Sequence, residues 1–300
     1  MSETMSLTPT EIRLMRQLSE GGKALSSLRS ELGLSPQQIS RPLRSLTKRG
    51  LVSVKKNGLS KTVLLSDVKS AQLLRNILIS YGHMNLEMIL SLSSLEIIAA
   101  LAFSQGGTIE EIASLSQKSP RTLATVFAQL REVGILEVDP PGTYRISTRF
   151  SSFGIFAMEL AEEFVNKEVI QLYPDALIRW QRGRTVLMES SIDEERGAFK
   201  ATSFSAFNRF ASPMILVKHW YIDHQSKKMP TIEEIVVHTL LLSPLDARQS
   251  KLFREFLRRV SKKISLTDLS SIAEEFGVSH EISGIAEDIA GGRRTIRRDP

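Results

Sequence analysis

The sequence contains no cysteine among its 300 residues, and this absence excludes disulfides and thiolate metal sites. No apolar run approaches the roughly 18 residues that a membrane-spanning helix needs. The N-terminal segment, MSETMSLTPT, lacks both the basic flank and the apolar core of a signal peptide. These absences predict a cytoplasmic protein with no membrane partner, and a chain of this length is expected to form two or three modest cores.

The sequence also lacks the familiar motifs of catalysis. It has no glycine-rich phosphate loop, no nucleophile elbow and no HExxH motif. Of its five histidines only His219 and His224 lie close together, and a spacing of five puts them on different sides of a helix. Glu234 and His238 are four residues apart, but one carboxylate and one imidazole make a weak metal site, so a surface pair is favoured. We therefore expect no enzyme activity, no cofactor and no metal.

Positive charge is concentrated at one end of the chain. The net charge is +6, and residues 1–67 alone hold eleven Lys or Arg against five Asp or Glu. Residues 68–92 carry +1, residues 93–150 carry −1, and residues 151–300 are neutral. A localised basic segment is the electrostatic footprint of a phosphate-binding surface.

Within the basic segment, residues 35–50 (SPQQISRPLRSLTKRG) predict an amphipathic helix. Ser35 is the expected N-cap, Pro36 suits the first turn, and Gly50 suits the left-handed position that ends a helix. At about 100° per residue, the apolar seam consists of Ile39, Leu43 and Leu46. The opposite face consists of Gln37, Arg41, Arg44 and Lys48, with Ser45 beside them. Pro42 lies beside the seam, where we expect it to bend the helix locally.

Two further helices are predicted before this one. Thr8 is the expected cap of the first, with Glu11 in position to complete a capping box, and Gly21-Gly22 ends it. Residues 24–32 form the second helix, which ends at Gly33.

A β-hairpin is predicted after the basic helix. The apolar period changes from 3.6 to 2, so residues 51–54 and 62–65 are expected strands joined by a turn at Asn57-Gly58. Three helices followed by a hairpin resemble the winged helix-turn-helix. The stretch SPQQISRPLRSLTKRGLV is similar to the recognition-helix-to-wing segment of ArsR- and MarR-type transcription regulators. The resemblance covers residues 7–67.

The resemblance implies that the basic helix enters the major groove of double-stranded DNA, because Arg and Gln make bidentate contacts with guanine and adenine edges. The DNA-contacting residues predicted on or beside this helix are Ser35, Gln37, Gln38, Ser40, Arg41, Arg44, Ser45, Lys48 and Arg49. Lys48 and Arg49 are expected to contact phosphates. The hairpin residues expected to reach the backbone or the adjacent minor groove are Lys55, Lys56, Asn57 and Lys61. A charged face that is merely solvated is the alternative.

The same pattern recurs 84 residues later, between residues 93 and 150. The matching pairs include Ser35-Pro36 with Ser119-Pro120, Leu46 with Leu130, Gly50 with Gly134, and LVSV with ILEV at residues 135–138. The polar face differs between the copies, because the counterparts of Gln37, Arg41, Arg44 and Lys48 are Arg121, Thr125, Ala128 and Glu132. Fewer phosphate contacts weaken DNA binding steeply. We therefore assign DNA binding to the first copy, and expect the second to contact protein or the same DNA weakly.

The rest of the chain gives less specific signals. Residues 68–92 predict one or two apolar helices, which either pack on a winged helix or pair with a second subunit. The resemblance makes a homodimer plausible, since twofold proteins match twofold operators. The elements expected in residues 151–300 are helices at 153–172, 232–242 and 250–260, strands at 185–188 and 214–217, and an acidic helical pair at 266–289. The basic tail is expected to be a disordered end.

Together these patterns predict a mainly α protein with small β-wings, an α+β fold. Two tandem winged-helix domains, 1–67 and 93–150, are joined by a helical linker, and residues 151–300 form a mixed, mostly helical domain for a partner or effector. The expected function is transcription regulation through double-stranded DNA, with a protein partner held by the second winged helix or the C-terminal domain. The alternatives are a winged-helix scaffold in a transcription or repair assembly and an antitoxin-type autorepressor.

Overall fold

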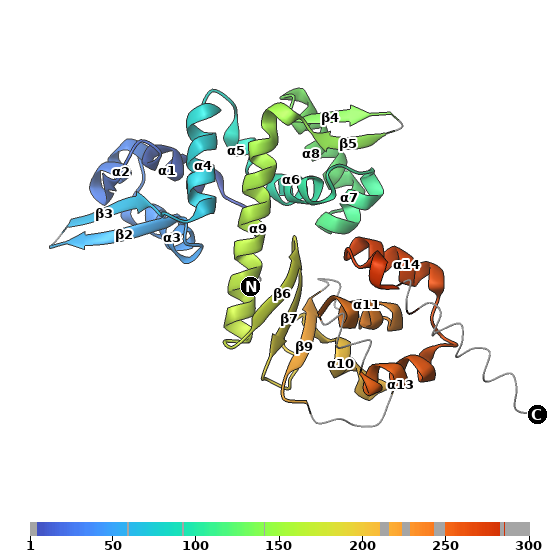
Figure 1. The fold of residues 1–300 in the computed structure, drawn as a ribbon. Coiled ribbons are helices and arrows are strands. Elements are labelled where there is room, and N and C mark those ends of the chain that lie inside the picture. The colour runs from blue at the N-terminus through green and yellow to red at the C-terminus, as the bar shows by residue number, and fades with distance from the viewer. Residues whose placement is uncertain are drawn as a thin grey trace, which may run out of the picture. The chain divides into compact units, whose positions relative to one another are not determined.

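The computed structural model describes residues 5–58, 60–91, 93–140, 142–210, 216–223, 229–242, 250–282 and 285. Its fold is mixed α+β, with many helices and small antiparallel sheets, and the chain divides into two compact units, Met1–Phe164 and Val165–Pro300 (Figure 1). Among the described residues, no helix combines the length and the apolar character needed to cross a bilayer.

The first unit begins with three helices and a hairpin. The elements are α1 (Pro9–Leu18), β1 (Lys23–Ala24), α2 (Leu25–Leu32), α3 (Pro36–Lys48), β2 (Val52–Asn57) and β3 (Ser60–Leu65). The predicted start of α1 is confirmed, because the Thr8 hydroxyl accepts from Glu11 N while Glu11 accepts from Thr8 N. The hairpin strands are longer than the periodicity predicted, and the last pair is Asn57 with Ser60, so Asn57 lies in β2 and the predicted turn is shifted by one residue.

Strand β1 was not predicted. It pairs with β3, where Lys23 faces Val63, and so makes a three-stranded sheet in the order β1-β3-β2. A strand of two residues has no periodicity to read, which is why the sequence pattern assigned Ala24 to the following helix.

A second set of three helices and a hairpin follows in the same unit. The elements are α6 (Ser93–Ser104), α7 (Ile109–Ser116), α8 (Pro120–Glu132), β4 (Leu136–Asp139) and β5 (Thr143–Ile146). Helix α7 begins with a capping box between Thr108 and Glu111, of the same kind as that of α1. Ser119 caps α8 by accepting from Thr122 N, as Ser35 does for α3.

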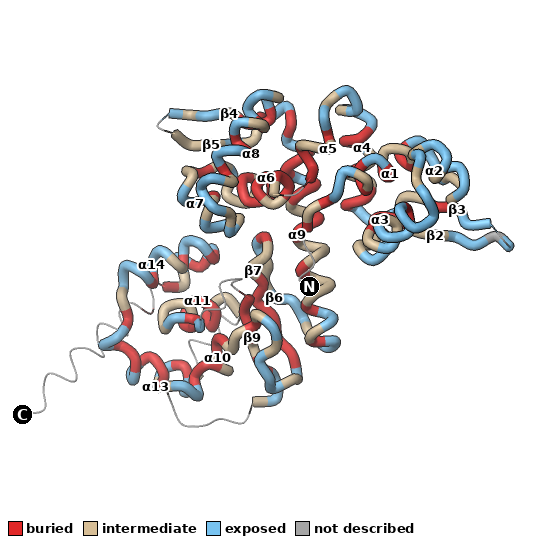
Figure 2. Tube along the Cα trace, turned by 180° about the vertical axis from the view of Figure 1, so that it is seen from behind, coloured by how far each residue is buried: buried red, intermediate tan, exposed pale blue. Residues whose placement is uncertain are grey.

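The core of the first unit is continuous. One cluster of buried apolar side chains extends from Met5 to Ala161 and includes the seams of both α3 and α8. Helix α6 is apolar on most sides, as expected of a central helix, and Figure 2 shows it buried along most of its length. Just before α1 and α6 the chain pairs with itself, through a parallel bridge between Leu7 and Ser91.

Helices α4 (Lys69–Ser80) and α5 (Leu86–Ile89) form the predicted linker between the two sets. Helix α4 packs on α1, where Arg75 Nε donates to the Ser19 carbonyl over 2.8 Å. A 3-10 turn, η1 (Thr148–Phe150), then leads into α9 (Ser151–Leu172), within which the division between the units falls. The Ser70 hydroxyl donates to Glu163 on α9 over 2.7 Å, and this bond ties the start of α4 to that helix.

The second unit contains a four-stranded antiparallel sheet in the order β6-β7-β9-β8. Its elements are β6 (Leu177–Arg182), β7 (Thr185–Ser190), β8 (Lys200–Ala201), α10 (Ser203–Ala206), η2 (Phe207–Arg209), β9 (His219–Asp223), α11 (Ile232–Leu242), α13 (Lys251–Val260) and α14 (Leu266–Glu275). Leu187 and Ile222 of the sheet share a core with the helices, in which the Phe207 and Phe256 rings stack with centroids 4.1 Å apart.

The predictions for this unit were partly wrong. The helices at 153–172, 232–242 and 250–260 and the strand at 185–188 are confirmed. Of the strand predicted at 214–217, Met214 and Ile215 lie outside the described residues, and Leu216 and Val217 are not in a strand. The neighbouring strand is β9 instead, whereas β6 and β8 went unpredicted. Helix α14 is the first of the acidic pair; residues 286–300, which include the basic tail, lie outside the described residues.

The expected surface position of His238 is also wrong. His238 is fully buried, and its Nδ1 lies 2.7 Å from the Thr202 hydroxyl. The described residues contain no group of three or more His, Asp or Glu able to hold a metal ion.

Asp175 provides a test of the second unit by pH. Its carboxylate accepts from the Ser191 hydroxyl and backbone N, each over 2.6 Å, and from the Ser190 hydroxyl over 2.7 Å. These hydrogen bonds hold the pKa of Asp175 well below its ordinary value of 3.8. A lowered folded pKa contributes stability that is present above the unfolded pKa and is lost as pH falls through the folded value.

We therefore expect Asp175→Asn to lower the melting temperature at pH 7, and the difference from wild type to shrink as the pH falls below about 4. Urea unfolding of both proteins across this pH range measures the effect. A difference that stays constant with pH would contradict the assignment.

Candidate nucleic-acid interface

Helix α3 begins and ends at the residues that its sequence predicts. Ser35 Oγ accepts from Gln38 N, and Gln38 Oε1 accepts from Ser35 N over 2.8 Å, which completes a capping box. Gly33, at φ 63°, ends α2 in the left-handed conformation and turns the chain toward α3. Gly50, at φ 76°, takes the left-handed position predicted for it. The beginning and the end of α3 are thus set by residues next to the helix in the sequence.

The apolar and polar sides of α3 are separated as its helical periodicity predicted. Ile39 and Leu46 are buried, at 2% and 0% exposure, and Leu43 packs against the same core. The residues exposed on the other side are Gln37, Gln38, Ser40, Arg41, Arg44 and Lys48. The helix is continuous through Pro42, which has no N–H to donate to the Gln38 carbonyl. The bend expected at Pro42 stays a prediction.

Arg41 and Arg44 of the basic face lie without a neighbouring carboxylate in the described part of the chain. Among the described residues no carboxylate lies within ion-pair distance of Arg41 or Arg44, whose guanidinium groups both lie on exposed side chains. Unneutralised cations on one face repel each other, so an anionic partner would stabilise this arrangement.

The hairpin adds further positive charge beside α3. Lys55, Lys56 and Lys61 are exposed, and Figure 2 shows the outer part of β2–β3 as an exposed ribbon. Lys56 and Lys61 face each other directly across the strand pair. Like charges at such positions destabilise a hairpin. Their placement is therefore better explained by binding of an anion than by stability of the free protein.

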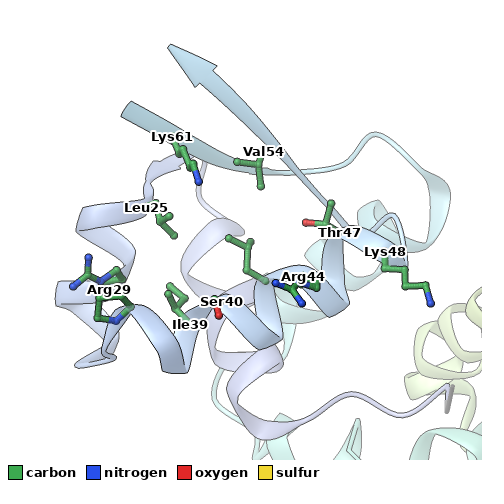
Figure 3. Close-up of a pocket in the computed structure, with 11 residues that line it drawn as sticks. Leu25, Arg29, Ile39, Ser40, Arg44, Thr47, Lys48, Val54 and Lys61 are labelled. Atoms are coloured by element: carbon green, nitrogen blue, oxygen red, sulfur yellow. The ribbon is translucent and has the colours of Figure 1, made fainter. Parts of the chain in front are cut away.

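A groove of about 620 Å³ lies between α2, α3 and the hairpin. Figure 3 shows its side chains coming from all three elements. Its apolar part includes Leu25, Ile39 and Val54, and Lys61 lies across the groove from Arg29. Arg29 was not among the predicted site residues, although its spacing of four from Leu25 puts both on the same side of α2.

The remaining predicted residues differ in their freedom to reach a ligand. Arg49 is half-buried, and its Nη1 donates to the Ser6 carbonyl over 2.7 Å, so it holds the N-terminal segment. Ser45 is half-buried, and the Ser40 hydroxyl donates to the Gln37 carbonyl over 3.1 Å. The Asn57 side chain lies outside what the structure describes. A DNA-contacting role for each of these residues stays a prediction.

The corresponding face of α8 has a different character. Arg121, Thr125, Ala128 and Glu132 are all exposed, as predicted, and they carry no net charge. The apolar seam is retained, since Leu123 and Leu130 are buried at 0% and 1% exposure. The two helices therefore share a core pattern and differ in the charge of their exposed faces.

Comparison with known proteins gives one partial likeness and two negative results. No family model matches the chain. No solved structure matches it. The Probable HTH-type transcriptional regulator ArcR of Halobacterium salinarum is 31% identical over 111 residues, which cover 35% of this chain and 42% of that relative. The chain thus spans less than half the length of this curated relative. The similarity therefore covers only part of each protein, and the relative is named as an HTH-type transcriptional regulator.

Proposed function

We propose that this chain is a transcription regulator that binds double-stranded DNA through a winged helix-turn-helix formed by residues 7–67. The observation that carries this proposal is the exposed basic face of α3, where Arg41 and Arg44 have no ion-pair partner among the described residues and lie beside a lysine-rich hairpin. The partial likeness to a named HTH-type regulator supports the same class. The relation to ArsR- and MarR-type regulators and the tandem arrangement belong to this proposal.

In this mechanism α3 lies in the major groove. Gln37, Arg41 and Arg44 meet base edges, because amide and guanidinium groups match adenine and guanine bidentately. Lys48 contacts a phosphate, and the hairpin lysines reach the backbone or the adjacent minor groove. The capping residues Ser35 and Gln38 fix where α3 begins, and so set the register of the reading face.

The rest of the proposal concerns partners. The neutral face of α8 and the second unit are assigned to protein or effector binding, and a homodimer would place two α3 helices on one operator. We propose a cytoplasmic protein without catalytic activity.

Selection from random duplex DNA with the full-length chain tests the function directly. We expect a recurring sequence to be enriched, with specific binding that weakens steeply as salt increases. Recovery of unselected sequences with a flat salt dependence would contradict the proposal and indicate that the basic face has another partner.

The hairpin lysines should affect every duplex alike. Replacing Lys56 and Lys61 with alanine is expected to weaken selected and random duplexes by the same factor. The slope of log affinity against log salt should fall by about 1 to 2, since each phosphate contact contributes about 0.9. Fluorescence anisotropy at several salt concentrations measures both effects.

The matched control replaces Lys251 and Lys262, which are exposed in the second unit. It removes the same charge, and we expect it to leave the slope unchanged. Equal slopes for both double variants would show that the hairpin does not contact phosphates.

A further inference from the structure

The N-terminal part of α8, including two residues of the face that corresponds to the basic face of α3, forms one wall of a pocket. The pocket has a volume of about 520 Å³, within the roughly 300–1,000 Å³ typical of small-molecule sites. From α8 come Arg121, Thr122 and Thr125, from the first turn of α6 come Ser93 and Ser94, and Ser91 lies just before that helix. The offset of 84 maps Arg121 and Thr125 onto Gln37 and Arg41.

Two nearly buried serine residues line this pocket. Ser91 and Ser94 are 7% and 5% exposed, and neither hydroxyl makes a hydrogen bond within the described part of the chain. Because no hydrogen bond within the described part of the chain uses either hydroxyl, both are available to a polar ligand that enters the pocket.

The electrostatics of the pocket favour an anion. It is lined by the first turns of α6 and α8, whose N-termini carry partial positive charge. Arg121 has no ion-pair partner among the described residues, and none of the described lining residues is Asp or Glu. The acid in the first turn of α6, Glu96, is paired with Lys118.

We propose that this pocket binds a small phosphorylated metabolite through its phosphate group. Arg121 supplies the charge-assisted contact, and the hydroxyls of Ser91 and Ser94 donate to phosphate oxygens. The proposal goes beyond DNA binding and does not rest on it. It gives Arg121 and Thr125 a role as pocket residues, at the positions that correspond to Gln37 and Arg41 of α3.

Inorganic phosphate is the probe, added to the full-length chain at constant ionic strength with chloride as the reference anion. We expect phosphate to raise the melting temperature of the wild type. In Arg121→Gln and Ser94→Ala the apparent affinity should fall at least about tenfold, as expected for loss of a hydrogen bond to a charged group. The control Arg131→Gln removes an exposed cation from the same helix, outside the pocket, and should respond as the wild type does.

A second measurement covers variants that fold poorly. Because the chain has no cysteine, Thr125→Cys introduces a single thiol, and bound phosphate should slow its alkylation. Equal responses of Arg121→Gln and wild type, with no protection of the thiol, would overturn the proposal by showing adventitious ion binding.

The source of the phosphate is resolved by DNA titration of the same variants. Unchanged affinity of Arg121→Gln for duplex DNA supports a free metabolite. A loss of DNA affinity as large as the loss of phosphate affinity would overturn the proposal, because the pocket would then hold a backbone phosphate.

Discussion

Replacing Arg41 and Arg44 together with alanine should weaken binding to the preferred duplex by about 10²- to 10⁴-fold. Each bidentate contact with a base contributes about 1–3 kcal/mol of discrimination, and two such contacts would be lost. Binding to random duplexes should fall much less, so the ratio of specific to non-specific affinity is the quantity to measure. Both side chains are exposed, so the free energy of unfolding should change by no more than about 0.5 kcal/mol per site.

A charge-matched control separates reading of bases from general attraction. Arg13 on α1 and Arg131 on α8 are both exposed, and replacing them with alanine removes the same two positive charges. We expect this control to weaken all duplexes slightly and to leave sequence preference intact. If both double variants lost affinity equally for every duplex, the assignment of α3 as the reading helix would be wrong.

Replacing Leu46 with alanine should lower the free energy of unfolding of the first unit by about 2–5 kcal/mol, the usual cost of emptying a fully buried leucine site. Leu46 is 0% exposed, and its counterpart Leu130 on α8 is 1% exposed. Because one continuous core contains both residues, we expect Leu46→Ala and Leu130→Ala to shift the same unfolding transition. Two measurements test this: urea unfolding monitored by far-UV circular dichroism, and thermal unfolding monitored by calorimetry.

The same pair of variants tests the domain boundaries predicted from the sequence. If residues 1–67 and 93–150 fold independently, Leu46→Ala should move one transition and Leu130→Ala another. Loss of DNA binding in Leu130→Ala, at a temperature where that variant is partly unfolded, would show in addition that α3 depends on the second set of helices. Retained binding under those conditions would contradict a shared folding unit.

Local signals predicted the first unit well because its elements are specified by short-range chemistry. The caps at Thr8 and Ser35 and the hairpin between Asn57 and Ser60 each involve residues within three or four positions. The exposed face of α3 followed from periodicity alone, since a buried seam leaves only one side for the cations.

Features that depend on contacts between residues far apart in the sequence could not be predicted from local patterns. The Arg49 guanidinium bonds to Ser6, 43 residues away, and no local pattern indicates that pair. His238 is buried against Thr202, 36 residues away, although its spacing from Glu234 suggested a surface. In the second unit the short strands lack clear alternation, since every residue of β7 after Thr185 is buried. The pocket on α8 likewise requires two segments that only the fold brings together.

The bridge between Leu7 and Ser91 has a consequence for the kind of DNA sequence this chain would recognise. These residues are 84 positions apart, which is the offset between the repeated segments, so corresponding points of the two segments touch each other. Two identical chains meet in this manner across a symmetry axis, and each must then keep the same surface. When both segments belong to one polypeptide, their surfaces can differ, so α3 carries a basic face whereas the corresponding face of α8 has no net charge. A single chain would accordingly recognise a non-palindromic half-site.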